Sequence, residues 1–282
     1  MEIQWFPGHM TKSMRMMEES VKLCDGIIYV VDARAPFACV NANLFKIFAN
    51  KPVLIVVNKA DLVAVADLDK IVANLGKEGY AAVCVNGTLQ KEVAKIYSAV
   101  VGLLAEKISK NKEKGVNKPL RMMVAGIPNT GKSTVINSLC GEKRAITGNK
   151  AGVTRGKQWI RLKDIELLDT PGTMPPKFEN QYYARHLGYI GSINDDILDL
   201  ESLCLEFIGE MKEGYPNELK EKYGLSDISG EPLGIFEEIC KKRGYLFKGG
   251  EYDYTRGARA VFDDFRKGRM GRICLETQRY ER

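Results

Sequence analysis

Short runs of consecutive apolar residues recur along the first part of the chain, each followed by a polar or glycine-containing segment. Such runs are typical of strands that are buried on both faces of a parallel sheet. They occupy residues 26–31, 53–57, 81–85 and 120–125, and residues 159–162 and 165–168 predict a further strand pair. The sequence therefore predicts an α/β fold with a mostly parallel sheet.

Between these runs, apolar residues recur at the spacing of an amphipathic helix. Such patterns cover 10–23, 68–75 and 96–108, and a helix is expected to start at 134–139. Helices that alternate with parallel strands cover both faces of the sheet. Residues 109–119 are polar, and we interpret them as a flexible linker.

After residue 177 the pattern contains no further strand. Helical periodicity recurs at 182–190, 195–212, 233–243 and 254–267. We therefore predict two domains, an α/β domain at 1–177 and a smaller all-helical domain at 178–282.

A glycine-rich segment, Gly126 to Ser133, follows the strand at 120–125 and fits the pattern G-x-x-x-x-G-K-[ST] of a phosphate-binding loop, or P-loop. Its backbone N–H groups and the following helix N-terminus would surround the phosphates of a nucleotide. Lys132 would reach the β- and γ-phosphates, and the Ser133 hydroxyl would bind Mg²⁺. The remaining phosphate-binding candidates are Asn129, Thr130, Gly131 and Thr134.

The strand at 53–57 runs into Asn58-Lys59-Ala60-Asp61, which matches the guanine-recognition motif N-K-x-D. The Asp61 carboxylate can accept from two N–H donors of guanine that adenine lacks, so this residue would select the base. Asn58 would support the site, and the Lys59 stem would cover the base. Asn86 and Gly87, after the strand at 81–85, are candidates for the loop over the guanine, although they depart from the usual Ser-Ala-Lys sequence.

Two further segments predict the part of the site that senses the γ-phosphate. Asp169-Thr170-Pro171-Gly172 fits D-x-x-G, in which Asp169 would hold Mg²⁺ through water and the Gly172 N–H would contact the γ-phosphate. Thr154 would be the switch threonine that contacts Mg²⁺ and the γ-phosphate. The alternative for Thr154 is an ordinary loop residue.

The order of these motifs differs from that of an ordinary GTPase, because N-K-x-D precedes the P-loop. Moving the chain ends while keeping the packing gives a circularly permuted P-loop GTPase. The chain resembles the YlqF/RbgA family of ribosome biogenesis GTPases over nearly its whole length. The segments that carry the resemblance are Trp5–Met10, Asp32–Pro36, Asn58–Asp61, Gly126–Ser133, Asp169–Gly172 and 268–272. The resemblance implies a GTPase, with GTP/GDP and Mg²⁺ bound, that assists late assembly of the large ribosomal subunit.

Catalysis is less evident from the motifs, because Thr173-Met174 rather than a water-orienting Gln follow Gly172. The family resemblance favours His9 as the group that orients the attacking water, and the alternative is a structural histidine. His9, Lys132 and Thr154 are therefore the catalytic candidates. Asn129 at its P-loop position is associated with K⁺ binding beside the phosphates, so K⁺ is a second candidate metal.

Charge and composition bear on the partners and the compartment. The net charge of +6 is concentrated in two stretches, 143–163 with seven basic and no acidic residues and 241–282 with twelve basic and six acidic residues. Such stretches favour a polyanion such as RNA as the partner, and the alternative is a solvated surface that is basic. The predicted phosphate-contacting group is Arg256, Arg259, Arg266, Lys267, Arg269 and Arg272.

No apolar run is long enough for a transmembrane helix, the start is unlike a signal peptide, and the seven cysteines form no C-x-x-C pair. We expect a cytoplasmic monomer that binds the large ribosomal subunit and neither a membrane nor DNA. Two functions stay open at this stage. The first is a GTP-hydrolysing assembly factor stimulated by the ribosomal particle, and the second is a GTP-dependent rRNA-binding module with negligible hydrolysis.

Overall fold

The computed structural model describes residues 2–4, 8–48, 50–141 and 158–276. Its centre is a six-stranded sheet of order β3-β2-β1-β4-β6-β5, in which only β5 is antiparallel to its neighbour. The strands are β1 (Gly26–Asp32), β2 (Val53–Asn58), β3 (Ala81–Val85), β4 (Leu120–Ala125), β5 (Gln158–Leu162) and β6 (Ile165–Asp169). Each lies where an apolar run predicts it, and the mostly parallel α/β sheet is confirmed.

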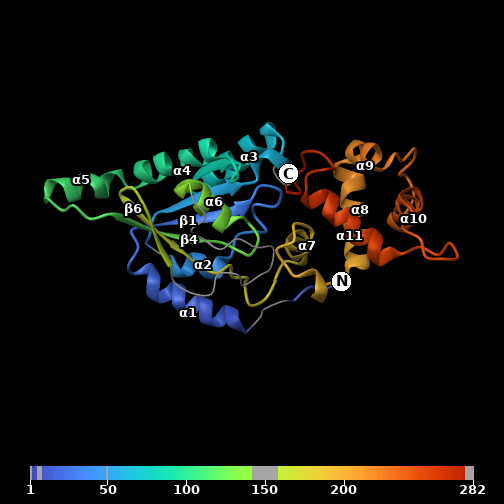
Figure 1. Ribbon diagram of the computed structural model, residues 1–282, viewed down its shortest axis with the longest axis horizontal. Coiled ribbons are helices and arrows are strands. Elements are labelled where there is room, and N and C mark those ends of the chain that lie inside the picture. Colours follow the sequence, from blue (N-terminus) through green and yellow to red (C-terminus); the bar gives the residue numbers. More distant parts are fainter. Residues whose placement is uncertain (1, 5–7, 49, 142–157, 277–282) are drawn as a thin grey trace.

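Helices cover both faces of this sheet, as predicted (Figure 1). They are α1 (His9–Val21), α2 (Ala42–Ile47), α3 (Val65–Lys77), α4 (Gln90–Leu103), α5 (Ala105–Glu113) and α6 (Lys132–Cys140). Successive side chains of a strand point to opposite faces. In β1, Tyr29 packs in the cluster with α1, α2 and α3, whereas Ile28 and Val30 pack in the cluster with α4 and α6.

The expected linker at 109–119 is only partly correct. Residues up to Glu113 belong to α5, which follows α4 after a break at Leu104. Lysines in its last turn, Lys110 and Lys112, favour the C-terminal end of a helix. The irregular connection is therefore confined to 114–119, just ahead of β4.

Among the described residues of the C-terminal part, the regular elements are helices, apart from an isolated bridge between Leu246 and Tyr252. Its helices are α7 (Gln181–Tyr189), α8 (Leu200–Gly214), α9 (Pro216–Tyr223), α10 (Pro232–Arg243) and α11 (Tyr254–Arg266). The helix predicted at 195–212 begins at Leu200, because Asp199 caps it by accepting from the Ser202 N–H. The short helix α9, begun by Pro216, is absent from the prediction.

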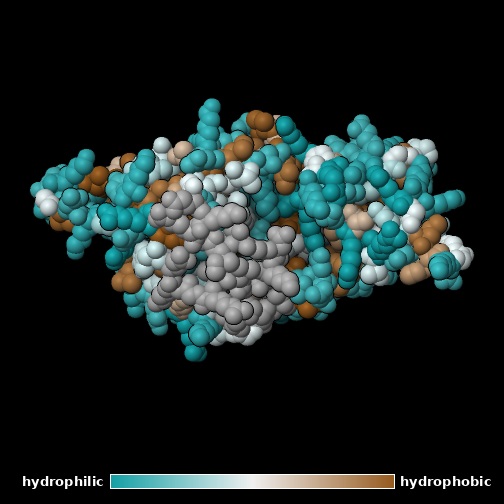
Figure 2. All heavy atoms as spheres, viewed as in Figure 1, coloured by the Kyte–Doolittle hydropathy of each residue, from teal (hydrophilic) through white to brown (hydrophobic). Residues whose placement is uncertain are grey.

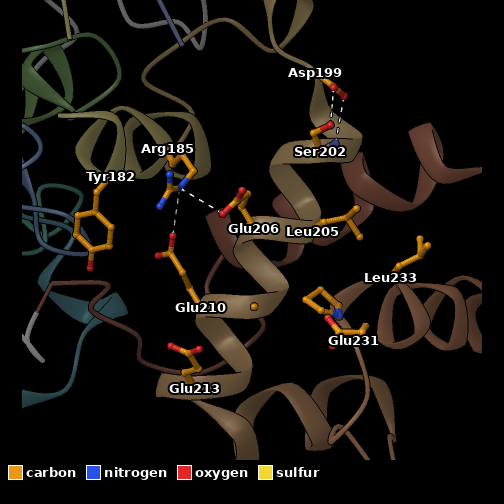
Figure 3. A pocket seen from close by; sticks show the side chains of 12 residues that line it. Tyr182, Arg185, Asp199, Ser202, Leu205, Glu206, Glu210, Glu213, Glu231 and Leu233 are labelled. Atoms are coloured by element: carbon orange, nitrogen blue, oxygen red, sulfur yellow. Dashed lines mark hydrogen bonds and ion pairs between the residues drawn. The ribbon is translucent and has the colours of Figure 1, made fainter. Parts of the chain in front are cut away.

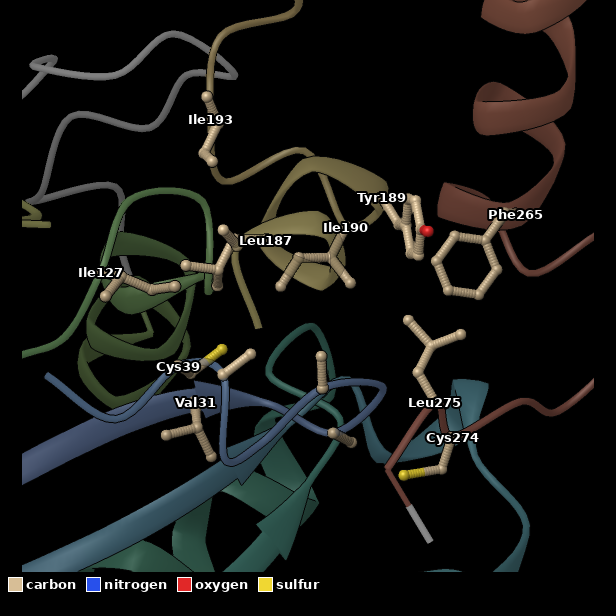
Figure 4. Close-up of a cluster of buried hydrophobic side chains, with 14 of the residues drawn as sticks. Val31, Cys39, Ile127, Leu187, Tyr189, Ile190, Ile193, Phe265, Cys274 and Leu275 are labelled. Atoms are coloured by element: carbon tan, nitrogen blue, oxygen red, sulfur yellow. The ribbon is translucent and has the colours of Figure 1, made fainter. Parts of the chain in front are cut away.

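One apolar core runs without interruption from the sheet into these helices (Figure 4). The end of α7 lies between Ile127 of the P-loop and Phe265 of α11, and it contributes Leu187, Tyr189 and Ile190 to this core. The chain then returns to the sheet as a segment of residues 268–276, here called the strap. The Ile273 N–H donates to the Leu62 carbonyl at 3.0 Å, and the Leu275 N–H donates to the Arg34 carbonyl at 2.8 Å.

Candidate nucleotide-binding site

The predicted motifs meet at one edge of the sheet, at the carboxyl ends of β1, β2, β4 and β6. Parallel pairing places Asp32 of β1 opposite Asn58 of β2, and Val124 of β4 opposite Asp169 of β6. In open α/β sheets this edge, outside the ends of the strands, is where ligands bind. The strand order places β1, which ends in Asp32, between β2, which leads into N-K-x-D, and β4, which leads into the P-loop.

The P-loop has the left-handed residues that its tight turn requires. Gly131 has φ 92° and Asn129 has φ 61°, and the loop ends where α6 starts at Lys132. The Lys132 ammonium is almost fully buried and donates to the Ile127 carbonyl at 2.7 Å. Burial lowers the pKa of Lys132 to about 8, although the charge of Asp169 opposes this change. A cation held inside the loop suits the binding of a polyphosphate.

Asn58 joins the P-loop to the candidate base loop. Its Nδ2 donates to the Thr130 carbonyl at 2.8 Å, and its Oδ1 accepts from the Gly87 N–H at 2.8 Å. The side chain is only 2% exposed, so both hydrogen bonds are shielded from water. A Cβ on residue 87 would lie 2.6 Å from the Asn58 Oδ1, which explains why glycine occupies this position. The structure thus brings Gly87 to the guanine motif despite its unusual sequence.

Lys59 is fixed by a buried carboxylate that the sequence analysis did not include in the site. Its Nζ donates to the Asn129 carbonyl at 3.0 Å and lies 2.7 Å from the Asp32 carboxylate. Arg34 makes a bidentate contact with the same carboxylate at 2.9 and 2.7 Å. Burial alone would raise the pKa of Asp32, but Arg34 and Lys59 hold it well below its usual range. The signal in the sequence was Asp32-Ala33-Arg34 at the end of a buried strand.

The remaining base-contacting candidates, Asp61 and Asn86, are more exposed than Asn58 and lie at the outer side of the nucleotide site. Asp61 is exposed in the short 3₁₀ helix Ala60–Leu62 that follows Lys59. The backbone of Asn86 is held by Glu92, whose carboxylate accepts from the Asn86 N–H at 2.7 Å. An exposed carboxylate next to an anchored loop is available to a guanine base.

The donor set expected for Mg²⁺ is partly described. Ser133 stands in the first turn of α6, and Asp169 is buried at the end of β6. Hydroxyl and carboxylate oxygens are ligands that Mg²⁺ prefers, so these residues fit the ion. Gly172 packs so tightly on the P-loop that a Cβ there would lie 2.7 Å from Pro128. Thr154 lies outside the described residues.

His9 is the first residue of α1, and its side chain lies outside the described part of the structure. Its neighbour Met10 is buried, and the Met10 sulfur accepts from the Met174 N–H at 3.3 Å. Met174 follows two residues after Gly172. The first turn of α1 is therefore anchored beside the segment that leaves the D-x-x-G motif.

The charged residues near the C-terminus do not all behave as predicted. The Arg266 guanidinium makes a bidentate contact with Asp195 at 2.7 and 2.8 Å and donates to the carbonyls of Gly188 and Tyr189. Lys267 and Arg269 pair with Asp263, and Arg269 also pairs with Asp264. Arg266 thus holds the end of α7 inside the protein, and its contact with phosphate stays a prediction.

A groove of about 810 Å³ lies between α7, α8 and the start of α10 (Figure 3). Arg185 points toward Glu206 and Glu210 in this groove. Behind it, the fully buried His186 joins Glu210 at 2.9 Å to Glu276 of the strap at 3.1 Å. Burial alone would lower the pKa of His186, but hydrogen bonds to the two carboxylates raise it. His186 thus links α8 to the strap through these two carboxylates.

Comparisons with known proteins agree with this geometry. Residues 121–206 match a family model described as a 50S ribosome-binding GTPase. The chain is 39% identical to ribosome biogenesis GTPase A of Bacillus cereus, over 98% of this chain and 94% of that protein. The chain belongs to the ribosome biogenesis GTPase A family. The family member from Bacillus licheniformis is 38% identical over 98% of both chains.

Solved structures of the family extend the likeness to the fold. The structure of GNP-bound YlqF from T. maritima is 25% identical, covers 94% of this chain and 97% of its own, and has a TM-score of 0.64. A GDP-bound YlqF structure has a TM-score of 0.65 at 25% identity and covers 93% of this chain and 98% of its own. The circularly permuted GTPase fold is confirmed, and the protein binds guanine nucleotide and hydrolyses GTP. The alternative of negligible hydrolysis is set aside.

Proposed function

We propose that the protein is a GTPase of ribosome biogenesis that assists late assembly of the large ribosomal subunit and is stimulated by the ribosomal particle. The nucleotide-binding part of this proposal rests on the bridge by Asn58, which joins the P-loop to the candidate base loop. The assembly part rests on the membership of the chain in the ribosome biogenesis GTPase A family. In this proposal the protein acts in the cytoplasm as a monomer. None of the described helices is long and apolar enough to cross a bilayer.

In the proposed site, Lys132 and the P-loop amides hold the phosphates, and Asp61 accepts from guanine. Asn129, Thr130, Gly131 and Thr134 line the phosphates, while Asn86 and Gly87 cover the base. Ser133, Thr154 and Asp169 would hold Mg²⁺, which neutralises charge on the phosphates. K⁺ would bind at Asn129.

The helical part is proposed to bind rRNA through Arg256 and Arg259 of the predicted group, because Arg266, Lys267 and Arg269 already pair with carboxylates. A hairpin between α10 and α11 exposes Phe247 to 57%, and Gly249 and Gly250 at its tip have positive φ. Exposed basic residues lie in the hairpin and in the helices before and after it, and several of them pair with no carboxylate among the described residues. This hairpin surface consists of Phe247, Lys241, Lys248, Arg256 and Arg259.

This surface has the chemistry that unpaired RNA requires. Arg256 stacks over Tyr245 at 5.4 Å, and the Asp253 N–H donates to the Tyr245 carbonyl, so the hairpin is fixed to α11. Aromatic side chains stack on RNA bases, and neighbouring cations contact the phosphates. At the end of the molecule that carries α10, hydrophobic atoms lie exposed among hydrophilic ones (Figure 2).

The proposal is tested by phosphate release from GTP, with and without large ribosomal subunits, in K⁺ and in Na⁺. The expected result is slow turnover by the protein alone and faster turnover with large subunits. Small subunits are the matched control. Equal rates with and without large subunits would contradict the assembly role while leaving the GTPase assignment intact.

His9 is proposed to orient the attacking water in the particle-bound state, because the first turn of α1 lies beside Met174. His9→Ala should lower the particle-stimulated rate about 10²–10⁴-fold and leave the affinity for GTP unchanged. Lys12→Ala, an exposed change on the same helix, is the control. Equal stimulated rates would remove the catalytic role, and lost GTP binding would indicate a structural histidine.

A further inference from the structure

The turn that follows α7 contacts the P-loop directly. The Ser192 hydroxyl donates to the Pro128 carbonyl at 2.9 Å, and the Asn129 Nδ2 donates to the Gly191 carbonyl at 2.7 Å. Ser192 is 1% exposed and Pro128 is buried, so water does not compete for the first of these bonds. Two consecutive P-loop residues are therefore held by two consecutive residues of the helical part.

The shape of this turn depends on Arg266. The Gly191 N–H donates to the Gly188 carbonyl and the Ser192 N–H to the Leu187 carbonyl, which is the Schellman arrangement that ends a helix. Gly191 has φ 76°, and a Cβ there would lie 3.0 Å from the Arg266 guanidinium. That guanidinium satisfies the last carbonyls of α7, where a positive charge is favourable.

A second set of contacts reaches the same P-loop residue from the other side. Arg34 donates to the Phe265 and Arg266 carbonyls at 3.4 and 3.1 Å, at the end of α11. The Asp32 carboxylate joins Arg34 to Lys59, and Lys59 donates to the Asn129 carbonyl. The contacts form a closed ring through the P-loop, α7, α11 and the guanine motif.

We propose that Ser192 and Arg266 are positioning residues for the P-loop. The affinity for GDP and GTP then depends on how the ends of α7 and α11 pack against the P-loop and the end of β1. The reason is the left-handed backbone of Asn129, with φ 61°, a conformation that costs free energy in a residue other than glycine and is stabilised here by its contacts. The ring fixes Asn129 through both its side chain and its carbonyl. By thermodynamic linkage, bound nucleotide must in turn stabilise the packing of these two helix ends against the nucleotide site. The proposal rests on the GTPase activity and does not require the RNA contact.

The first test compares the GDP affinity of variants by titration with a fluorescent GDP analogue. Ser192→Ala removes one hydrogen bond and should weaken binding about three- to tenfold. Its kcat at saturating GTP should change by less than about twofold, because ground-state binding is what is lost. Arg266→Gln should weaken GDP binding by at least as much. The affinity of Arg266→Lys should lie between that of Arg266→Gln and that of the parent, because an ammonium group can replace only some of the guanidinium hydrogen bonds.

Two matched controls separate positioning from general destabilisation. Ser20→Ala removes a buried hydroxyl that donates to the Met16 carbonyl within α1. Arg243→Gln removes a guanidinium that donates to the Lys222 carbonyl and covers Tyr223, a role similar to that of Arg266 but away from the P-loop. Both should bind GDP as the parent does, even where thermal unfolding shows reduced stability.

The second test measures the reciprocal effect by amide hydrogen exchange. GDP should slow exchange at residues 188–192 in the parent, and this slowing should be smaller in Ser192→Ala. Folded Ser192→Ala and Arg266→Lys proteins that bind GDP as tightly as the parent would overturn the proposal. Unchanged exchange at 188–192 on adding GDP to the parent would overturn it equally.

Discussion

Replacing Asn58 by Asp tests whether one amide links the phosphate and guanine loops. The substitution keeps the shape and preserves the acceptor for the Gly87 N–H. It replaces the Nδ2 donor, so an oxygen of the new carboxylate faces the Thr130 carbonyl where the hydrogen bond now measures 2.8 Å. The site is 2% exposed, so water cannot fully compensate.

The size of the effect follows from this loss. A buried carbonyl left without its donor costs about 1–3 kcal/mol, and two facing oxygens add to that cost. Since 1.4 kcal/mol corresponds to about tenfold in affinity, Asn58→Asp should weaken GDP binding about 10–100-fold at pH 8. Protonation gives the carboxyl group an O–H donor, so the loss should shrink as the pH is lowered toward about 5.

Titration with a fluorescent GDP analogue between these pH values measures both effects. Asn74→Asp is the control, because the Asn74 amide also donates to a backbone carbonyl, that of Lys70, but on α3 away from the site. Parent-like affinity of Asn58→Asp at pH 8 would refute the bridging role. A loss of affinity that does not vary with pH would refute the explanation by the missing donor.

Three further predictions concern other parts of the molecule. Asp61→Asn should strongly weaken GTP binding in the same titration, because two hydrogen bonds to a charged group are at stake, each worth about 1.5–3 kcal/mol. The pKa of His186 is raised on folding, so its protonation stabilises the folded protein below its ordinary pKa, and this stabilisation is lost as the pH rises through the folded value. Urea unfolding as a function of pH should reveal this dependence in the parent and not in His186→Gln. Changing Lys248, Arg256 and Arg259 of the hairpin surface to Gln should weaken rRNA binding and lower its salt slope by about 0.7–0.9 per lost phosphate contact, and an unchanged slope would move the contact elsewhere.

The sequence predicts the sheet well, because a buried parallel strand has to be continuously apolar wherever it lies in the chain. It also predicts the P-loop and N-K-x-D, whose functions depend on residues that are adjacent in sequence. Short helices are missed, because α2 and α9 have too few residues for a period to be recognisable. The linker prediction failed in its first half because a polar lysine-rich segment can still be helical at the surface.

The contacts between distant segments could not be predicted in this way. Arg266 stands in a basic stretch, and its partner Asp195 is 71 residues earlier in the chain. Asp32 and Arg34 attract notice in the sequence, but their connection to Asn129 and α11 depends on the sheet order and the return of the chain. Charge composition reports which side chains can contact phosphate and does not report which already have partners.

The strap also has a consequence for the time at which the protein becomes active during its own synthesis. The ribosome makes Leu62 of the guanine loop more than 200 residues before Ile273, whose N–H supports it. Glu276, which accepts from the backbone of Phe37 and Ala38, is made later still. A nascent chain therefore carries a complete P-loop long before the segment after N-K-x-D gains its contact with the strap. Tight and selective nucleotide binding should begin only after the strap has left the translating ribosome, so an unfinished copy would not compete for GTP.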